Sequence, residues 1–182
     1  MKKEYKKPKI VFKKLKVNLF SRVNRGFDLL EDGSVLLAAC SNANCCVSCF
    51  LKDTEILMAD GSKKAIENIE KGDFVKTKGN EKLSQITIAK VVKVFKGEAD
   101  NHLDIKLENN TIIKVTHSHP FFINNRWMKI EEAKVKDNLL DQNNKLIKIV
   151  EINHINKKSI IYNITVEKYH TYFANGIYVH NK

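Results

Sequence analysis

Short runs in which apolar and charged residues partly alternate dominate the chain after residue 49. The segments "ITIAKVVKVF" (86–95) and "HLDIKL" (102–107) are rich in Ile and Val and follow this pattern. A period of two is typical of a β-strand with one buried face. Four more runs have the same character, and we predict strands there as well: 111–115, 145–152, 160–166 and 176–179.

Turn-forming pairs separate these runs. Asp60-Gly61, Asn109-Asn110 and Asn143-Asn144 stand between apolar segments, where Asn, Asp and Gly tolerate the backbone angles of tight turns. A helical period is limited to a turn or two. The pattern therefore predicts a mostly β domain with few short helices.

A weak internal repeat indicates how this domain is organised. "IENIEKGDFV" (66–75) and "IEEAKVKDNL" (130–139) superpose at an offset of 64 residues. Each is a short amphipathic turn that ends at an Asp and enters an apolar run. Such self-similarity predicts two related halves arranged about a pseudo-twofold axis.

Composition and charge narrow the class of protein. The 182 residues are 43% hydrophobic and 29% charged, which is typical of a globular chain. No apolar run approaches the ~18 residues of a membrane span, and none near the N-terminus suits a secretory leader. We expect a cytoplasmic monomer that has no membrane partner and no cofactor.

The formal net charge of +11 is concentrated near the start of the chain. Residues 1–48 hold ten Lys and Arg against four Asp and Glu. Such a segment could contact nucleic acid. No aromatic platform or recognition helix accompanies the charge, so we interpret residues 1–48 as a solvated flank and expect no nucleic-acid partner.

All four cysteines lie within ten residues, at positions 40, 45, 46 and 49. Disulfides that stabilise a fold would be spread along it. Cys46-x-x-Cys49 could form half of a zinc site, but the second half is missing, so we expect no metal. The remaining interpretation is that one cysteine is a nucleophile at the first residue of a domain.

Polar residues suited to proton transfer occur at three points of the β region. "VTHSHPFF" (115–122) places Thr116 and His119 three residues apart, after a strand and before a proline. His117 would point the other way in an extended segment. A single histidine is more often an ordinary loop residue, but here Cys49 opens the β region, the Thr/His pair lies midway, and a last group closes it: His170, His180 and Asn181.

These residues carry a resemblance to a known family. Three segments resemble the sequence blocks of the Hint superfamily: "CFLKDTEILMADGSKKAIENIEKGDFV" (49–75), "VTHSHPFF" and "YNITVEKYHTYFANGIYVHN" (162–181). This superfamily includes inteins, bacterial intein-like domains, Hint modules before bacterial toxin domains and the Hedgehog autoprocessing domain. The resemblance implies a horseshoe-shaped, two-lobed β fold over residues 49–181. Residues 1–48 would then be an upstream flank, and Lys182 the remainder of a downstream one.

The resemblance also implies a reaction at the upstream junction. Cys49 would attack the carbonyl of Ser48 and convert the Ser48–Cys49 peptide bond into a thioester, which water or a thiol then opens. Thr116 would hold the polar atoms of the scissile bond. His119 would protonate the departing nitrogen of Cys49.

At the downstream junction the resemblance implies cyclisation. The Asn181 carboxamide would attack its own main-chain carbonyl, form a succinimide and cleave the Asn181–Lys182 bond. His180 would polarise that carbonyl, and His170 would act as the general base.

Two departures from the family pattern shape the prediction. Splicing inteins need Cys, Ser or Thr after the Asn, and Lys182 offers no such nucleophile. Many inteins also have Asp where this chain has Asn163, which favours uncoupled cleavage. We therefore predict a single-turnover autocatalytic domain whose substrate is its own flanking polypeptide, with splicing minor or absent. The alternatives are an inactive Hint scaffold and a basic module that binds nucleic acid or zinc.

Overall fold

The computed structural model describes residues 27–29, 35–37, 48–79 and 85–181, the first two ranges by their backbone only. Within these ranges the regular elements are strands and two short 3-10 helices, as the alternating pattern predicts. The strands join in one continuous sheet. No helix in the described part of the chain is long and apolar enough to cross a membrane.

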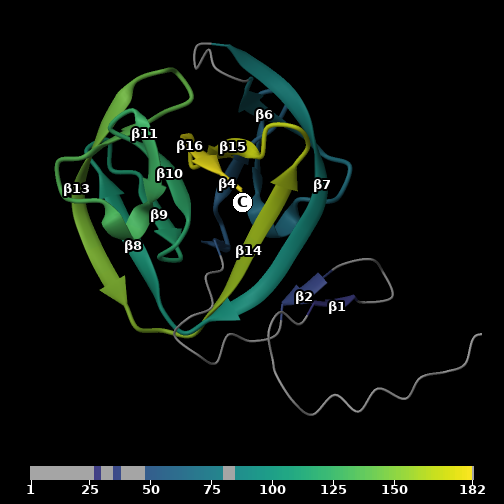
Figure 1. Cartoon of the computed structure of the whole chain (residues 1–182), viewed down its shortest axis with the longest axis horizontal. Helices are drawn as coiled ribbons and strands as arrows, with labels where there is room; N and C mark the ends of the chain where they lie inside the picture. The colour runs from purple at the N-terminus through teal and green to yellow at the C-terminus, as the bar shows by residue number, and fades with distance from the viewer. Residues whose placement is uncertain (1–26, 30–34, 38–47, 80–84, 182) are drawn as a thin grey trace, which may run out of the picture.

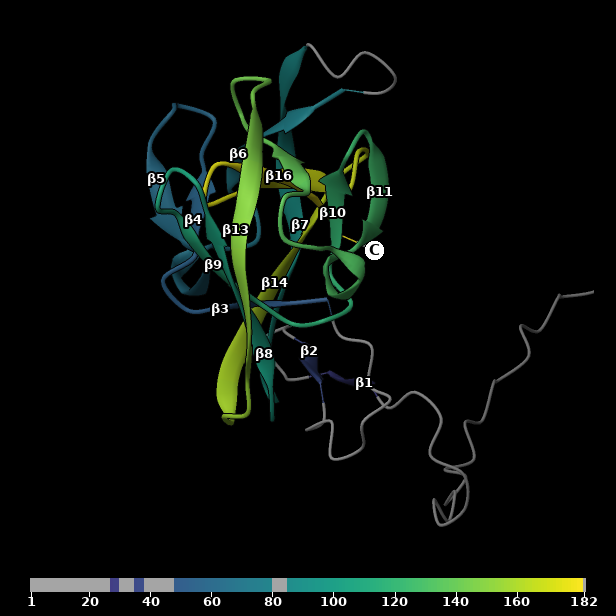
Figure 2. The ribbon, with the colours of Figure 1, turned by 90° about the vertical axis from the view of Figure 1, so that its left-hand side faces the viewer.

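Two long curved strands, β7 and β13, form the sides of the molecule, and the end of the chain lies between them (Figure 1). A view from the side shows the same strands running the length of the body (Figure 2). The elements of the first part are β3 (Phe50–Leu51), β4 (Glu55–Leu57), β5 (Lys63–Ala65), η1 (Ile66–Asn68), β6 (Phe74–Lys78), β7 (Ile86–Ala99), β8 (His102–Leu107) and β9 (Ile112–Val115). Those of the second are β10 (Pro120–Ile123), β11 (Arg126–Lys129), η2 (Ile130–Glu132), β12 (Asn138–Leu140), β13 (Leu146–Ile155), β14 (Ser159–Val166), β15 (Thr171–Ala174) and β16 (Ile177–His180).

All six predicted strands are present. β8 matches its prediction residue for residue, while β7 continues four residues beyond its predicted end. The reason for the extension is tertiary, because β7 pairs with β14 as far as the Ser159–Ala99 pair. The apolar faces meet in one core in which many Ile, Val, Leu and Phe side chains are fully buried, each contributing about 1.5–3 kcal/mol.

The internal repeat corresponds to equivalent structure. η1 and η2 begin at the two repeated Ile residues and are followed by the repeated aspartates. The carboxylate of Asp73 accepts the N–H of Glu70 at 2.9 Å, and that of Asp137 accepts the N–H of Lys134 at 2.8 Å. The main-chain carbonyls of the same two aspartates each accept an N–H from the following long strand at 2.8 Å. The two halves are also joined by strand pairing, because β7 of the first half pairs with β14 of the second, and β8 of the first pairs with β13 of the second.

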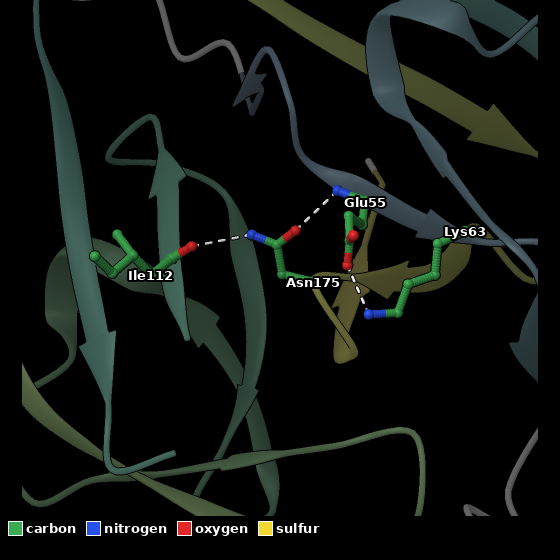
Figure 3. A network of polar contacts seen from close by, with 4 residues as sticks. All are labelled: Glu55, Lys63, Ile112 and Asn175. Carbon is green, nitrogen blue, oxygen red and sulfur yellow. Dashed lines mark hydrogen bonds and ion pairs between the residues drawn. The ribbon is translucent and has the colours of Figure 1, made fainter. Parts of the chain in front are cut away.

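The turn between β15 and β16 is fixed to other parts of the sheet by Asn175 (Figure 3). Its carboxamide oxygen accepts the N–H of Glu55 at 2.8 Å, and its nitrogen donates to the carbonyl of Ile112 at 3.0 Å. The Glu55 carboxylate also pairs with Lys63 at 2.6 Å. Because β16 starts at this turn, the network fixes the start of the strand that ends at His180.

Part of the upstream flank joins the sheet. β1 (Phe27–Leu29) and β2 (Val35–Leu37) form an antiparallel pair, and β2 runs parallel to β7 on the edge opposite β14. The remaining residues of the segment 1–47, with Cys40, Cys45 and Cys46, lie outside the described residues, as does Lys182.

Candidate functional site

The upstream junction links half-buried Ser48 to buried Cys49 and is held at several points. Only 1% of Cys49 is exposed, and its side chain packs against Leu51 and Ile161. Burial raises the pKa of its thiol, because a thiolate would lose its hydration there. In this state the sulfur is a protonated, poorly reactive thiol, and a neighbouring base must take its proton before it can attack a carbonyl.

Thr116 holds the main chain of Cys49 on both sides. Its hydroxyl accepts the N–H of Cys49 at 2.8 Å and donates to the carbonyl of the same residue at 3.1 Å. The N–H of Thr116 donates to that carbonyl as well, at 2.9 Å. The hydroxyl therefore contacts the nitrogen that becomes the leaving group if the Ser48–Cys49 bond breaks.

Asn163 of β14 holds the carbonyl of Ser48, and this contact was not predicted from the sequence. Its Nδ2 donates to the Ser48 oxygen. Its Oδ1 accepts the N–H of Ile164 at 2.7 Å and the hydroxyl of Tyr172 at 3.0 Å. Because two donors face Oδ1, the amide orientation is determined and the N–H₂ group must face Ser48. The result is a fixed donor at the oxygen that would become negative during attack.

His119 is fully buried beside this junction. Its ring lies against Phe50, with the centroids 4.3 Å apart. Burial lowers the pKa of His119 to about 3; the backbone of Ser48 opposes the shift and the charge of His180 adds to it. Neither ring nitrogen has a partner with good hydrogen-bond geometry within the described residues, so the Ser48 contact is close but poorly aligned. His119 is therefore neutral at pH 7 and can accept a proton.

At the downstream junction the asparagine is buried, and the two histidines beside it are more open to solvent. Only 3% of Asn181 is exposed, and its Nδ2 donates to the carbonyl of Ile164. The side chain of His180 is half-buried, and that of His170 is exposed. His170 contacts Asn181 through its main chain, because its carbonyl accepts the Asn181 N–H at 2.6 Å. Its ring centroid lies 6.4 Å from that of His180, and its φ of 53° belongs to a left-handed turn.

The two junctions meet on consecutive residues of β14. Asn163 binds the carbonyl of Ser48, and Ile164 binds the carboxamide of Asn181. The effect of the His180 charge on the pKa of His119 agrees with this proximity. The sequence predicts that Cys49, Thr116, His119, His180 and Asn181 converge, and the structure brings them together. The imidazole of His170 lies at the solvent-exposed side of the same group.

Within the described ranges, no three His, Cys, Asp or Glu side chains are grouped as metal ligands. Cys46 is outside these ranges, so the Cys46–Cys49 pair is not tested. Contacts missed by sequence reasoning include those of Tyr172 and of Ser118, whose carbonyl accepts the Ser48 hydroxyl at 3.2 Å. Asn163 carried one signal, its difference from the family pattern, but nothing in the sequence marked Tyr172.

The model of the pretoxin Hint domain family matches residues 55–182, well over half of the chain. The chain belongs to this family. The Hint domain is also similar to solved structures. It is 28% identical to the bacterial intein-like domain from Clostridium thermocellum, with a TM-score of 0.69, and the match covers 74% of this chain and 99% of that one.

A second solved structure, a DnaB intein from Synechocystis sp., is 25% identical to the Hint domain. The TM-score is 0.66, and the match covers 75% of this chain and 99% of the intein. No functionally curated protein matches the chain. Together, the family match and the two solved structures establish a Hint fold similar to that of intein-like domains.

Proposed function

We propose that this Hint domain cleaves its own polypeptide at two junctions, Ser48–Cys49 and Asn181–Lys182. The observation that carries the proposal is the meeting of both junctions on Asn163 and Ile164. A structural domain has no evident need to bury a cysteine, a neutral histidine and a terminal asparagine together. An autoprocessing domain needs them at one place, because near-attack geometry replaces the missing protease.

The upstream step begins with the thiol of Cys49. Neutral His119 takes the thiol proton, and the sulfur attacks the carbonyl carbon of Ser48, whose oxygen receives the Asn163 N–H. The C–N bond then breaks, and His119 returns the proton to the Cys49 nitrogen, which becomes a free amine. The product is a thioester between Ser48 and Cys49. Addition of water yields a carboxylic acid on Ser48 and restores the thiol.

The low pKa of His119 refines the role predicted for it. At about 3 the ring begins as a neutral imidazole at neutral pH, so any proton that it delivers to the Cys49 nitrogen is one that it takes up during the reaction. Thr116 stabilises the departing nitrogen through the hydrogen bond that it already forms.

The downstream step is a cyclisation. The Asn181 nitrogen leaves its hydrogen bond with Ile164 and attacks the main-chain carbonyl carbon of Asn181. The bond to Lys182 breaks, the Lys182 nitrogen receives the proton that the carboxamide loses, and Lys182 departs with a free amine while Asn181 becomes a succinimide. His180 donates to the carbonyl oxygen, and His170 accepts the amide proton directly or through water, as its exposure permits. Lys182 has no hydroxyl or thiol, so ligation of the flanks is not expected.

The family name refers to pretoxins, and we propose that the natural cargo of such cleavage is a toxin-like segment downstream of the domain. Release of that segment would require only the Asn181 step.

Intact-mass measurement of freshly purified protein tests the proposal. We expect a species lighter by one free lysine, that is, by the Lys182 residue plus one water, and fragments from a break between Ser48 and Cys49 that increase with added thiol. Cys49→Ala removes only the fragments, and Asn181→Ala removes only the lysine loss. His119→Ala suppresses the fragments, whereas His117→Ala, the matched control on a nearby half-buried histidine, retains them. A chain that stays at full length through prolonged thiol treatment would establish an inactive scaffold instead.

A further inference from the structure

Trp127 contacts the residue that precedes the reacting asparagine. It lies on β11 opposite Phe122 of β10, and β10 pairs in turn with β16 through Phe121 and Val179. From this position the indole reaches across β10 to the ring of His180. The centroids are 5.2 Å apart, and the planes meet at 74°, an edge-to-face arrangement.

The same indole is held from two other sides. Its centroid lies 5.3 Å from that of Phe122 and 5.1 Å from that of Tyr178. Phe122 and Tyr178 belong to a small apolar cluster of buried residues that is separate from the main core. The three contacts fix the indole on a rigid base, although 40% of Trp127 remains exposed.

His180 directly precedes the reacting asparagine, and its imidazole packs against the Trp127 indole on one side and faces His170 at 6.4 Å on another. Asn181 is buried and bonded through both its main chain and its carboxamide, whereas the imidazole before it is half-buried at the edge of the site. Near-attack geometry tolerates little misalignment between the imidazole and the carbonyl that it would polarise. An aromatic ring packed against the imidazole limits its rotation.

We propose that Trp127 is a positioning residue for downstream cleavage, holding the imidazole of His180 toward the Asn181 carbonyl. The inference rests on the proposed function. Among the described residues, the contact that links Trp127 to the downstream junction is the one with His180, so Trp127 acts through that residue. Upstream cleavage does not use this contact.

The test compares both cleavage rates in one chain. Trp127→Ala is expected to slow release of Lys182 about tenfold, equivalent to about 1.4 kcal/mol, with the Ser48–Cys49 rate unchanged. Trp127→Phe is expected to restore most of the rate, because it keeps an aromatic face. Phe74→Ala is the matched control, since Phe74 is an aromatic residue of β6 that is 52% exposed; it should leave both rates unchanged.

A spectroscopic measurement separates positioning from a loss of stability. In a full-length chain carrying Cys49→Ala and Asn181→Ala, the ring protons of His180 should show a ring-current shift. Trp127→Ala should remove this shift, and Trp127→Phe should retain part of it.

Equal downstream rates in the unaltered chain and Trp127→Ala, or a His180 shift that does not change, would overturn this inference alone. Parallel loss of both cleavages in Trp127→Ala would also overturn it, since it would indicate a general structural role. Absence of any lysine release from the unaltered chain would overturn the proposed downstream step and this inference together.

Discussion

The two junctions of the Hint domain are built differently although they meet on one strand. Ser48 and Cys49 lie among buried donors, beside a histidine that burial keeps neutral. Asn181 is equally buried, but the imidazoles next to it, those of His180 and His170, are half-buried and exposed. Fixed donors in a dry environment dominate at the first junction, and proton exchange with solvent is available at the second.

This contrast has a chemical reason. In the proposed upstream step a negative charge develops on the Ser48 oxygen, and fixed donors stabilise such a charge most where water is excluded. The proposed cyclisation of Asn181 removes a proton from a weakly acidic amide, and water can carry that proton away. Each junction therefore has an environment suited to the step proposed for it. Selective substitutions should separate the two.

The largest separation is expected from Asn163→Asp. Aspartate keeps an oxygen for the donors on Ile164 and Tyr172 but loses the N–H that reaches the carbonyl of Ser48. We expect the upstream rate to fall about a hundredfold and the downstream rate to stay within about twofold, as measured by intact mass over time.

The control is Asn109→Asp, the same chemical change at an exposed turn between β8 and β9, where the side-chain oxygen accepts the N–H of Thr111 at 3.1 Å. It should leave the ratio of the two rates unchanged. If Asn163→Asp slows both cleavages equally, the division between the junctions is wrong.

A smaller effect is expected from Thr116→Val, which keeps the shape of the side chain and removes the hydroxyl bonded to the Cys49 nitrogen. Loss of this hydrogen bond should slow the upstream step about tenfold. Thr116→Ser should recover most of the rate because it restores the hydroxyl. The measurement is the rate of Ser48–Cys49 cleavage with excess thiol. If Thr116→Val cleaves as fast as the unaltered chain, Thr116 has no part in the mechanism.

The neutral state of His119 predicts a pH dependence of stability. Its folded pKa is about 3, below its ordinary value near 6.5. Between these values the unfolded chain binds a proton that the folded chain does not, so folding stability decreases as the pH falls. One such proton contributes at most about 1.4 kcal/mol per pH unit.

Urea unfolding at pH 7, 6 and 5 measures this slope. The chain should carry Cys49→Ala and Asn181→Ala, so that it remains intact. Adding His119→Gln should make the slope shallower. His102 and His117, whose pKa values burial also lowers, are common to both proteins and cancel in the comparison. Identical slopes would mean that folding leaves the pKa of His119 unchanged, which would contradict its burial as a neutral group.

The smallest expected effect belongs to Tyr172→Phe, which removes one of the two donors that orient the Asn163 amide. The upstream rate should fall about fivefold, in keeping with the ~1 kcal/mol of one hydrogen bond. In the double variant that also carries Asn163→Asp, the fold reduction of the upstream rate should be smaller than the product of the reductions in the two single variants. Both substitutions act through the same contact with Ser48. Fully multiplicative losses would show that Tyr172 acts independently of Asn163.

Much of the fold could be predicted from local pattern. Alternation identified β8, and the repeat at an offset of 64 identified the two 3-10 helices, because each repeat carries its own Ile, turn and Asp. The continuation of β7 to Ala99 could not be predicted, since it depends on pairing with β14, more than sixty residues away.

The same distinction applies to the site. Cys49, Thr116, His119 and Asn181 carry chemical character that the sequence displays directly. Every residue has a main-chain carbonyl, so residue type does not single out Ile164. Only the register of the sheet selects its carbonyl as the partner of the Asn181 carboxamide. Trp127 reaches His180 across an intervening strand, and no spacing along the chain encodes that contact.

The burial of Cys49 has a consequence for the life of the unprocessed protein. Peroxide and alkylating agents attack exposed thiolates, and this sulfur is neither exposed nor ionised. Under the proposed single-turnover cleavage a damaged nucleophile cannot be replaced, so shielding of the Cys49 sulfur would preserve the capacity of the uncleaved chain until it reacts.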